Sequence, residues 1–251
     1  MTKLTVALQL YTIRDFANAN LPDTLKKIKA MGYNAVELAG MYGLSAQELR
    51  KELDTAELVA FSAHVPFAQF EQDMHGAIAA YKLLGCKYIA IPMINKNQLP
   101  GCEGWENTRN IIANAATLCM EADMPLMYHN HAFEFEMLPN GQYILDEIFD
   151  SVPKLQAELD TGWITAAGLC PVAYIEKYAG RLPVVHLKDT VKAGDTYEDR
   201  PVGQGSQDMT AILQAAKNAN AVGVVVELDR AVGITSLEAA EKSLEFLARK
   251  V

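Results

Sequence analysis

The sequence predicts an α/β fold, a single-domain (β/α)8 (TIM) barrel that spans residues 1–251. Eight short apolar runs recur at intervals of about thirty residues, and a helical pattern follows each of them. Strands that alternate with helices form right-handed βαβ crossovers in a parallel sheet, and eight such units fit a chain of 251 residues. An open doubly wound sheet is the main alternative. It would normally have a glycine-rich turn after the first strand, and QLYTIRD has none.

The expected strands are apolar, β-branched segments of five to seven residues. In chain order they are LTVALQL (residues 4–10), AVELA near 35, LVAFSAH near 58, KYIAIPM near 87, PLMYHNH near 125, LQAELD near 155, PVVHLKD near 183 and GVVVELD near 223. Gly32, Gly85 and Gly180 precede the second, fourth and seventh strands, where a helix end favours a left-handed residue. These junctions predict a helix directly before each of the three strands.

Capping boxes mark the starts of two of the expected helices. Ser45 is followed by Glu48, and Thr235 by Glu238, so each pair can satisfy free amides at a helix start. The helix after Thr235 also has a regular apolar face that reaches the end of the sequence. Both segments are therefore predicted to be helical.

Composition limits the classes of partner. Half of the residues are hydrophobic and 21% are charged, which is typical of an ordered globular chain. The net charge of -9 disfavours binding to nucleic acid. No segment is an uninterrupted apolar run of about 18 residues and the N-terminal segment lacks a signal cleavage site, so we expect no membrane partner and a cytoplasmic location.

Polar residues stand at the carboxyl ends of most of the expected strands. Because a barrel strand is covered on both faces, an ionisable group at its carboxyl end is costly unless it has a function. These residues are Glu37 on the second strand, His64 on the third, His129 and His131 on the fifth, Asp160 on the sixth, His186 on the seventh and Glu227 on the eighth. The carboxyl ends of barrel strands converge on one face, where active sites are built.

Three of these residues form a chemically coherent set. Asp160, His186 and Glu227 offer two carboxylates and an imidazole, which together can bind one divalent cation such as Mn2+, Co2+, Mg2+ or Zn2+. Glu37 and His64 are expected to bind substrate, although Glu37 could instead cap a helix or pair with Arg14, and His64 could be an ordinary loop histidine.

Several motifs together resemble the sugar phosphate isomerase/epimerase superfamily of xylose-isomerase-like barrels. They are LQLYTIRD, AVELAG, YHNHAFEFE, ELDTGW, VVHLKD, PVGQG and VVVELD, and they span nearly the whole chain. The segment YHNH resembles the corresponding segment in a YHNH-containing subgroup of that superfamily. The resemblance implies a small-molecule sugar or keto-sugar substrate and one metal ion held by Glu, Asp, His and Glu at four strand ends.

The first of these four ligands departs from the epimerase pattern. A histidine, His129 or His131, stands at the end of the fifth strand where those enzymes have a glutamate. The resemblance makes Glu134 the expected ligand, because it restores the set with Asp160, His186 and Glu227, and His131 is the alternative.

The implied reaction removes a proton from the carbon next to a carbonyl and forms an enediolate. Glu227 and Glu134 are the expected bases, and His129 and His131 supply an additional acid or hydrogen bonds to substrate hydroxyls. Lys188 is expected to neutralise an oxyanion or bind a hydroxyl, and Trp163 to form an apolar wall for a sugar ring.

Other functions remain open from the sequence. The same enediolate can expel a β-substituent, so a lyase or dehydratase acting on inosose or 3-keto-sugar derivatives is the main alternative. An AP endonuclease-like DNA repair enzyme shares the barrel, but five histidines and the charge of -9 disfavour it. A sugar-binding barrel without catalysis would not be expected to keep Asp160, His186 and Glu227 together. The sequence leaves open whether the chain forms a homo-oligomer.

Overall fold

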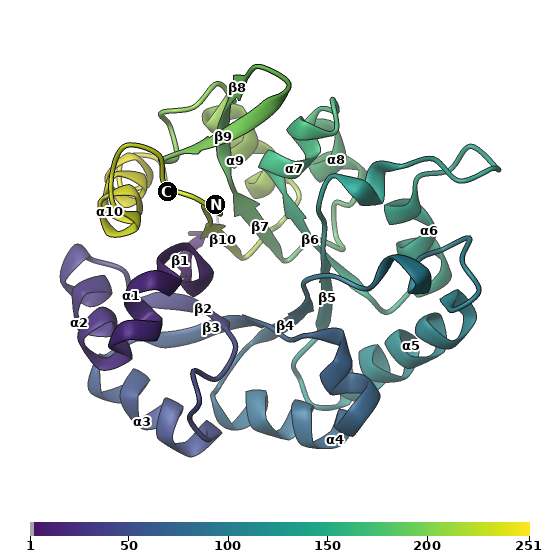
Figure 1. Ribbon diagram of the computed structural model, residues 1–251, viewed down its shortest axis with the longest axis horizontal. Helices are drawn as coiled ribbons and strands as arrows, with labels where there is room; N and C mark the ends of the chain where they lie inside the picture. Colours follow the sequence, from purple (N-terminus) through teal and green to yellow (C-terminus); the bar gives the residue numbers. More distant parts are fainter. Residues whose placement is uncertain (1–2) are drawn as a thin grey trace.

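The computed structural model describes residues 3–251 and contains a closed barrel of eight parallel strands surrounded by helices (Figure 1). Around the barrel the strands follow the order β1, β10, β7, β6, β5, β4, β3 and β2, and β2 pairs with β1 to close the ring. Their bounds are β1 Thr5–Gln9, β2 Ala35–Ala39, β3 Val59–His64, β4 Tyr88–Ile91, β5 Leu126–His129, β6 Gln156–Asp160, β7 Val184–Leu187 and β10 Gly223–Val226. The predicted fold and all eight predicted strands are confirmed.

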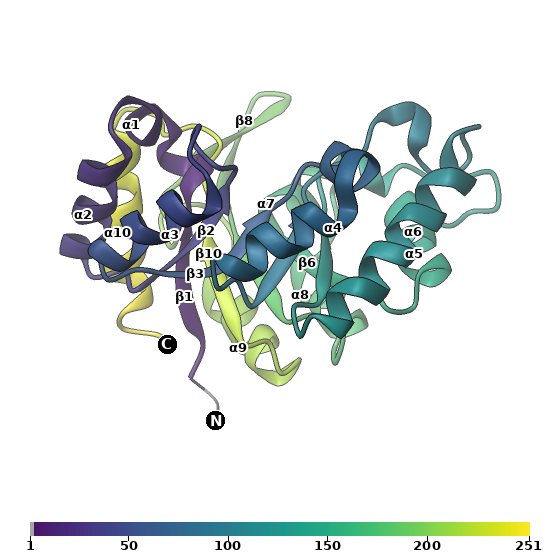
Figure 2. The ribbon, with the colours of Figure 1, turned by 90° about the horizontal axis from the view of Figure 1, so that it is seen from below.

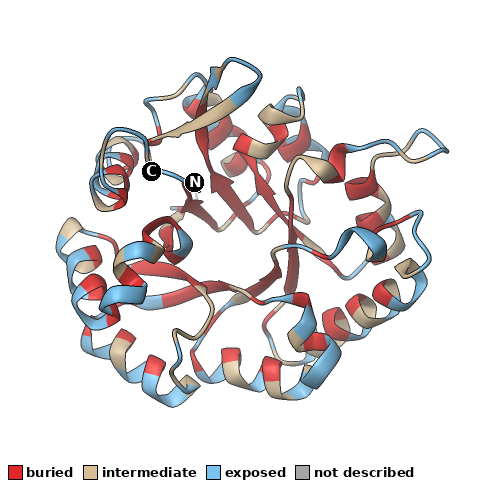
Figure 3. Cartoon of the chain, viewed as in Figure 1, coloured by how far each residue is buried: buried red, intermediate tan, exposed pale blue. Residues whose placement is uncertain are grey.

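Helices cover the outside of the barrel, and their inward faces are buried (Figure 3). The α-helices are α1 Arg14–Ala19, α2 Leu21–Met31, α3 Ala46–Thr55, α4 Phe67–Leu83, α5 Trp105–Glu121, α6 Ile144–Ser151, α7 Thr161–Ala166, α8 Pro171–Lys177, α9 Met209–Asn218 and α10 Ser236–Leu247. Short 3-10 helices are η1 Leu10–Ile13, η2 Lys96–Gln98 and η3 Phe133–Phe135. None of the helices within residues 3–251 combines the length and the apolar character needed to cross a membrane.

The local signals act as the sequence predicts. Both capping boxes form, with Ser45 at the start of α3 and Thr235 at the start of α10. Gly32 ends α2 with φ of 109°, a backbone conformation that favours glycine. Each signal therefore fixes where a helix stops or starts relative to its neighbouring strand.

One element lies outside the barrel. Strands β8 (Asp189–Ala193) and β9 (Thr196–Arg200) form an antiparallel hairpin after β7, seen in side view as an arm that extends beyond the barrel (Figure 2). The apolar-run pattern did not predict these strands. Asp189 accepts hydrogen bonds from the backbone N–H groups of Gly203 and Gly205, which ties the segment after β9 to the hairpin.

The barrel interior changes from apolar to polar along the strands. One inner layer is apolar and consists of Ala7, Ala35, Phe61, Ala90, Met127, Val184 and Val225. Because side chains alternate across a strand, the residue two positions further along points the same way. On five strands that residue is polar, namely Gln9, Glu37, His129, His186 and Glu227. This alternation places the functional side chains at the carboxyl end of the barrel, directly above its apolar core.

Candidate metal centre and active site

Four side chains at the strand ends form the group that we call the outer group, consisting of His129, Asp160, His186 and Glu227. One nitrogen or oxygen atom from each lies within 4.8 Å of the others. The closest contact joins His186 Nδ1 and Glu227 Oε2 at 3.0 Å. The three predicted ligands are Asp160 on β6, His186 on β7 and Glu227 directly after β10; the structure brings them together, and all three are buried.

The outer group fits a divalent cation. Asp160 Oδ1 accepts a hydrogen bond from the backbone N–H of Trp163 and caps α7. Asp160 Oδ2 is buried and has no hydrogen-bond partner among residues 3–251. Burial, helped by nearby Glu227, outweighs the opposing effect of Lys188 and raises the pKa of Asp160 to about 7. A buried carboxylate oxygen that accepts no hydrogen bond within residues 3–251, together with a second carboxylate and an imidazole, forms a donor set that suits Mn2+, Co2+ or Zn2+.

Lys188 supplies the positive charge nearest to this group. Its Nζ lies 3.4 Å from Asp160 Oδ2, 3.4 Å from Glu227 Oε2 and 2.8 Å from Asp229 Oδ2. Burial lowers the pKa of the Lys188 ammonium, but these three carboxylates outweigh that effect and raise it. A Cβ on Gly162 would lie only 2.6 Å from Lys188 Cγ, so the glycine of DTGW leaves room for the lysine stem. The ammonium therefore remains charged and shares the carboxylates of the outer group.

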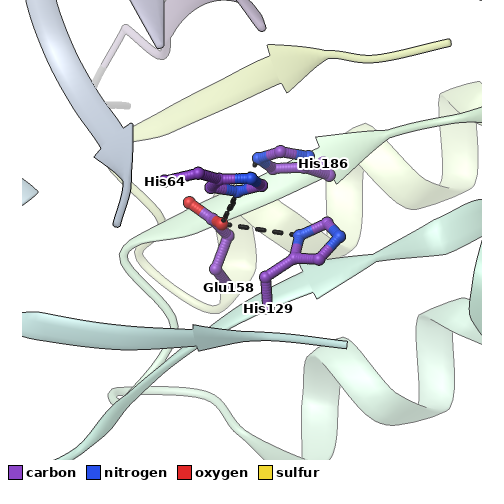
Figure 4. A group of neighbouring side chains, drawn as sticks. All are labelled: His64, His129, Glu158 and His186. Carbon is purple, nitrogen blue, oxygen red and sulfur yellow. Dashed lines mark hydrogen bonds and ion pairs between the residues drawn. The ribbon is translucent and has the colours of Figure 1, made fainter. Parts of the chain in front are cut away.

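A second group, the inner group, consists of His64, His129, Glu158 and His186 (Figure 4). Glu158 Oε2 lies 2.8 Å from His64 Nε2, 3.4 Å from His129 Nδ1 and 3.4 Å from His186 Nε2. Burial raises the pKa of Glu158, but His186 and His64 together lower it well below its usual value. Glu158 is thus a buried carboxylate at the meeting point of three imidazoles.

Glu37 supports the imidazoles from below. Its Oε2 accepts a hydrogen bond of 2.7 Å from the Gln9 amide, and its Oε1 accepts one of 2.5 Å from the Ser62 hydroxyl. The same Oε2 lies 2.7 Å from His186 Nε2 and 3.2 Å from His64 Nε2. Glu37 is fully buried, and it is not among the residues that line the cavity above the barrel, although the sequence predicts that it binds substrate.

Glu134, the predicted first ligand and second base, lies outside both groups. The short helix η3 turns its carboxylate back towards β5, where Oε1 accepts a hydrogen bond from the Tyr128 hydroxyl and Oε2 accepts one from the His131 backbone N–H. Burial raises the pKa of Glu134 to about 7. The side chain therefore fixes the loop after β5, and its position does not support the predicted role of metal ligand.

The two histidines of YHNH occupy different environments. His129 is buried and belongs to both the outer and the inner group. Burial lowers its pKa well below the usual value. His131 is partly exposed and packs near Phe133 and Trp163, with ring centroids 5.8 Å and 5.4 Å away. Burial and nearby Lys188 lower the pKa of His131 to about 4. At neutral pH His131 is uncharged, which suits hydrogen bonds to a substrate better than proton donation.

A cavity of about 480 Å³ opens above the outer group. It is lined by His64, His129, His131, Trp163 and Glu227, with further contributions from Tyr11, Pro66, Met93 and Asp229. Four of the predicted substrate or catalytic residues therefore face the same space as Glu227. Lys188 lines an adjacent cavity of about 520 Å³ beside the β8–β9 hairpin, and Trp163 and Asp229 border both cavities.

Sequence reasoning missed Glu158 and Asp229. Glu158 is two positions before Asp160 in AELD, so strand alternation puts both carboxylates on the inner face of β6. Asp229 is two positions after Glu227 in ELD and holds Lys188. The same two-residue spacing would have identified each of them.

Comparisons with known proteins agree with this architecture. Inosose dehydratase from Clostridium beijerinckii is 23% identical over 209 residues, which cover 69% of this chain and 68% of the relative. A sugar phosphate isomerase/epimerase from Parabacteroides distasonis has a crystal structure with a TM-score of 0.79 and 23% identity, covering 98% of this chain and 94% of that chain. An IOLI protein crystallised with a bound zinc atom has a TM-score of 0.73 and 19% identity, covering 99% and 98% of the two chains. At these identities the two structural likenesses show the fold.

The family model described as the xylose isomerase-like TIM barrel matches residues 25–250. This match covers seven of the eight barrel strands and includes both groups at their carboxyl ends. The chain therefore belongs to the xylose isomerase-like TIM barrel family.

Proposed function

We propose that the chain is a divalent-metal-dependent sugar isomerase or epimerase that removes a proton from the carbon next to a carbonyl. The observation that carries the proposal is the meeting of Asp160, His186 and Glu227 below the cavity, with Asp160 Oδ2 buried and without a hydrogen-bond partner in the described chain. These three residues would hold the ion, and His129 is the fourth side chain of the group. When bound, the ion supplies a Lewis acid for the substrate carbonyl.

Glu227 is the proposed base. It is the carboxylate of the outer group that also lines the cavity. Burial raises the pKa of Glu227, but Lys188 and His186 together lower it well below its usual value, so the group is ionised at neutral pH. An ionised carboxylate at the wall of the substrate cavity can accept the substrate proton, and the adjacent Lys188 ammonium limits the accumulation of negative charge.

The rest of the cavity would orient the substrate. The neutral imidazole of His131 and the partly exposed ring of His64 can hydrogen-bond to hydroxyl groups. Trp163 offers an aromatic face, over which the Lys188 Nζ lies 4.9 Å from the ring centroid. Hydroxyl binding beside an aromatic wall favours a sugar or keto-sugar as the substrate class.

A dehydratase acting on an inosose or a 3-keto-sugar is the second candidate function. The similarity to inosose dehydratase favours it, and the same proton removal begins both reactions. The two outcomes differ in what leaves afterwards, since a dehydratase expels water from the carbon beyond the one that loses the proton.

The experiment is incubation of the metal-loaded protein in D2O with a panel of ketoses, inososes and 3-keto-glycosides. Incorporation of one deuterium into recovered or isomerised sugar supports isomerisation, and loss of water or of an aglycone identifies the lyase reaction. The variant Glu227→Gln should abolish exchange because its amide cannot accept the proton. Absence of exchange and of elimination across the panel, with the metal bound, would contradict the proposal.

A further inference from the structure

The segment directly after β10 is held in place by side chains. The backbone N–H of Leu228 donates to the Thr12 hydroxyl at 3.1 Å. The N–H groups of Asp229 and Arg230 both donate to Asp199 Oδ2, at 2.6 Å and 3.0 Å. From here to the start of α10 the chain forms neither helix nor strand. The path of the segment therefore depends on a few side-chain acceptors, and Asp199 supplies two of these three hydrogen bonds.

The β8–β9 hairpin fixes the position of Asp199. In its ladder Asp199 lies opposite Thr190, next to the pair Asp189–Arg200 at the base of the hairpin. Thr190 is 3% exposed, and its carbonyl accepts hydrogen bonds from both the N–H and the hydroxyl of Ser206. Asp199 thus belongs to the anchored end of the hairpin, and it offers its carboxylate to the segment after β10 from a fixed backbone.

One of the two amides that Asp199 binds belongs to the residue that holds Lys188. Asp229 Oδ2 lies 2.8 Å from Lys188 Nζ, closer than the carboxylate oxygens of Asp160 and Glu227, which are both 3.4 Å from Nζ. Because the Asp229 side chain is short, its carboxylate moves with its backbone. The backbone position of Asp229 therefore determines where the ammonium lies beside the proposed base, Glu227.

Asp199 contacts the backbone of this segment and not the ammonium itself. In the part of the chain that the structure describes, the carboxylates within 4.0 Å of Lys188 Nζ are those of Asp160, Glu227 and Asp229. Hydrogen bonds from backbone N–H groups to an ionised carboxylate are short and about twice as strong as bonds between neutral groups. Two such bonds to one oxygen restrain the direction of both peptide groups.

We propose that Asp199 is a positioning residue that fixes the Asp229 backbone and so holds the Lys188 ammonium beside Glu227. The β8–β9 hairpin then supports the reaction from outside the barrel. The inference rests on the proposed function for the role of Glu227 as the base, whereas the connection from Asp199 to Lys188 is a property of the folded chain alone. Two other roles of Asp199 must be separated from this one, namely a negative charge near the ammonium and a purely local contribution to stability.

The first experiment compares kcat and KM for deuterium exchange by the metal-loaded protein and its variants. Asp199→Asn keeps a carbonyl oxygen that can accept both N–H groups, so its kcat should stay close to that of the unmodified protein. Asp199→Ala removes the acceptor and Asp199→Glu displaces it. Both should lower kcat about tenfold with little change in KM, since a misplacement of about 1 Å can cost roughly 100-fold in rate. Asp195→Ala, at the exposed turn of the same hairpin, is the matched control and should change neither constant.

The second experiment requires no catalysis and is a double-mutant cycle. The free energy of unfolding in urea is measured without metal for the unmodified protein, Asp199→Ala, Lys188→Met and the double variant. Losses of stability at independent sites add, whereas losses at coupled sites do not. We expect Asp199→Ala to lower stability less in the Lys188→Met protein than in the unmodified protein, because the ammonium that it helps to place is already absent.

Three results would overturn the inference. They are additive losses in the cycle, an unchanged kcat in Asp199→Ala, and a kcat that falls in Asp199→Asn but is kept in Asp199→Glu, which would assign Asp199 the role of a charge. If Asp199→Ala does not fold, Asp199→Glu takes its place in both experiments. A coupled cycle in an unmodified protein that exchanges no deuterium would refute the proposed function and leave the connection from Asp199 to Lys188 intact.

Discussion

Replacement of Lys188 by methionine probes the sharing of carboxylates between a lysine and a metal ion. The ammonium lies 2.8–3.4 Å from carboxylate oxygens of Asp160, Glu227 and Asp229, and its side chain is 2% exposed. Methionine keeps much of the apolar stem and removes the charge. The substitution therefore leaves buried carboxylates without their cation, unless a metal ion replaces it.

The expected magnitude follows from these contacts. Removing one partner of a buried ion pair costs about 3–5 kcal/mol. Each kcal/mol corresponds to about 2–4 °C in a domain of this size, so Tm of the metal-free protein should fall by about 6–20 °C. Saturating metal supplies the missing charge, and the difference in Tm between Lys188→Met and the unmodified protein should become smaller.

The assay is thermal unfolding of both proteins, with chelator and with excess Mn2+, followed by circular dichroism. Lys192→Met is the control, since Lys192 is exposed on the β8–β9 hairpin, and it should leave Tm nearly unchanged in both conditions. If Lys188→Met lowered Tm by the same amount with and without metal, the sharing of carboxylates between Lys188 and a metal ion would be refuted. The same conclusion would follow if Lys188→Met lowered Tm no more than the control does.

Three further predictions concern residues around the cavity. Glu134→Gln should keep the metal content of the unmodified protein, because Glu134 lies outside both groups. A lower metal content in elemental analysis would show that Glu134 is a metal ligand after all. Burial raises the pKa of Glu134 to about 7, so its protonation stabilises the fold fully below pH ~4.5, and this contribution is lost as pH rises through about 7. The free energy of unfolding in urea should thus be larger for the unmodified protein than for Glu134→Gln at pH 5, and this difference should shrink by pH 8. A difference that stays constant over this range would contradict the raised pKa of Glu134. Trp163→Ala should raise KM roughly tenfold, for a loss of about 1–2 kcal/mol, and Trp163→Phe should raise it less. If steady-state kinetics gave an unchanged KM for Trp163→Ala, Trp163 would not contact the substrate.

The barrel was predictable because its strands are buried on both faces. Runs such as GVVVELD and PVVHLKD begin with consecutive apolar residues and end in a segment with ionisable residues, which indicates both a parallel strand and its functional end. The β8–β9 hairpin was missed because its strands, DTVKA and TYEDR, are partly exposed and charged. Gly194, with φ of 62°, marks its turn, but no apolar run surrounds that glycine.

The site was predictable where strand alternation alone sets the direction of a side chain. Asp160, His186 and Glu227 end three regular strands, so their convergence follows from the closure of the barrel. Glu134 follows β5 within an irregular loop, and its direction depends on η3 and on the hydrogen bonds from Tyr128 and His131. A residue pattern does not determine such a loop conformation, so this part of the site required the structure.

The most direct test of the proposed metal centre is a crystal structure of the protein grown with Mn2+, with anomalous data collected above the manganese absorption edge. We predict an anomalous peak in contact with the side chains of Asp160, His186 and Glu227, and a Lys188 ammonium displaced from Asp160. The account would be contradicted if a crystal grown at saturating Mn2+ had no anomalous peak among these three residues and Lys188 Nζ still lay between Asp160 and Glu227.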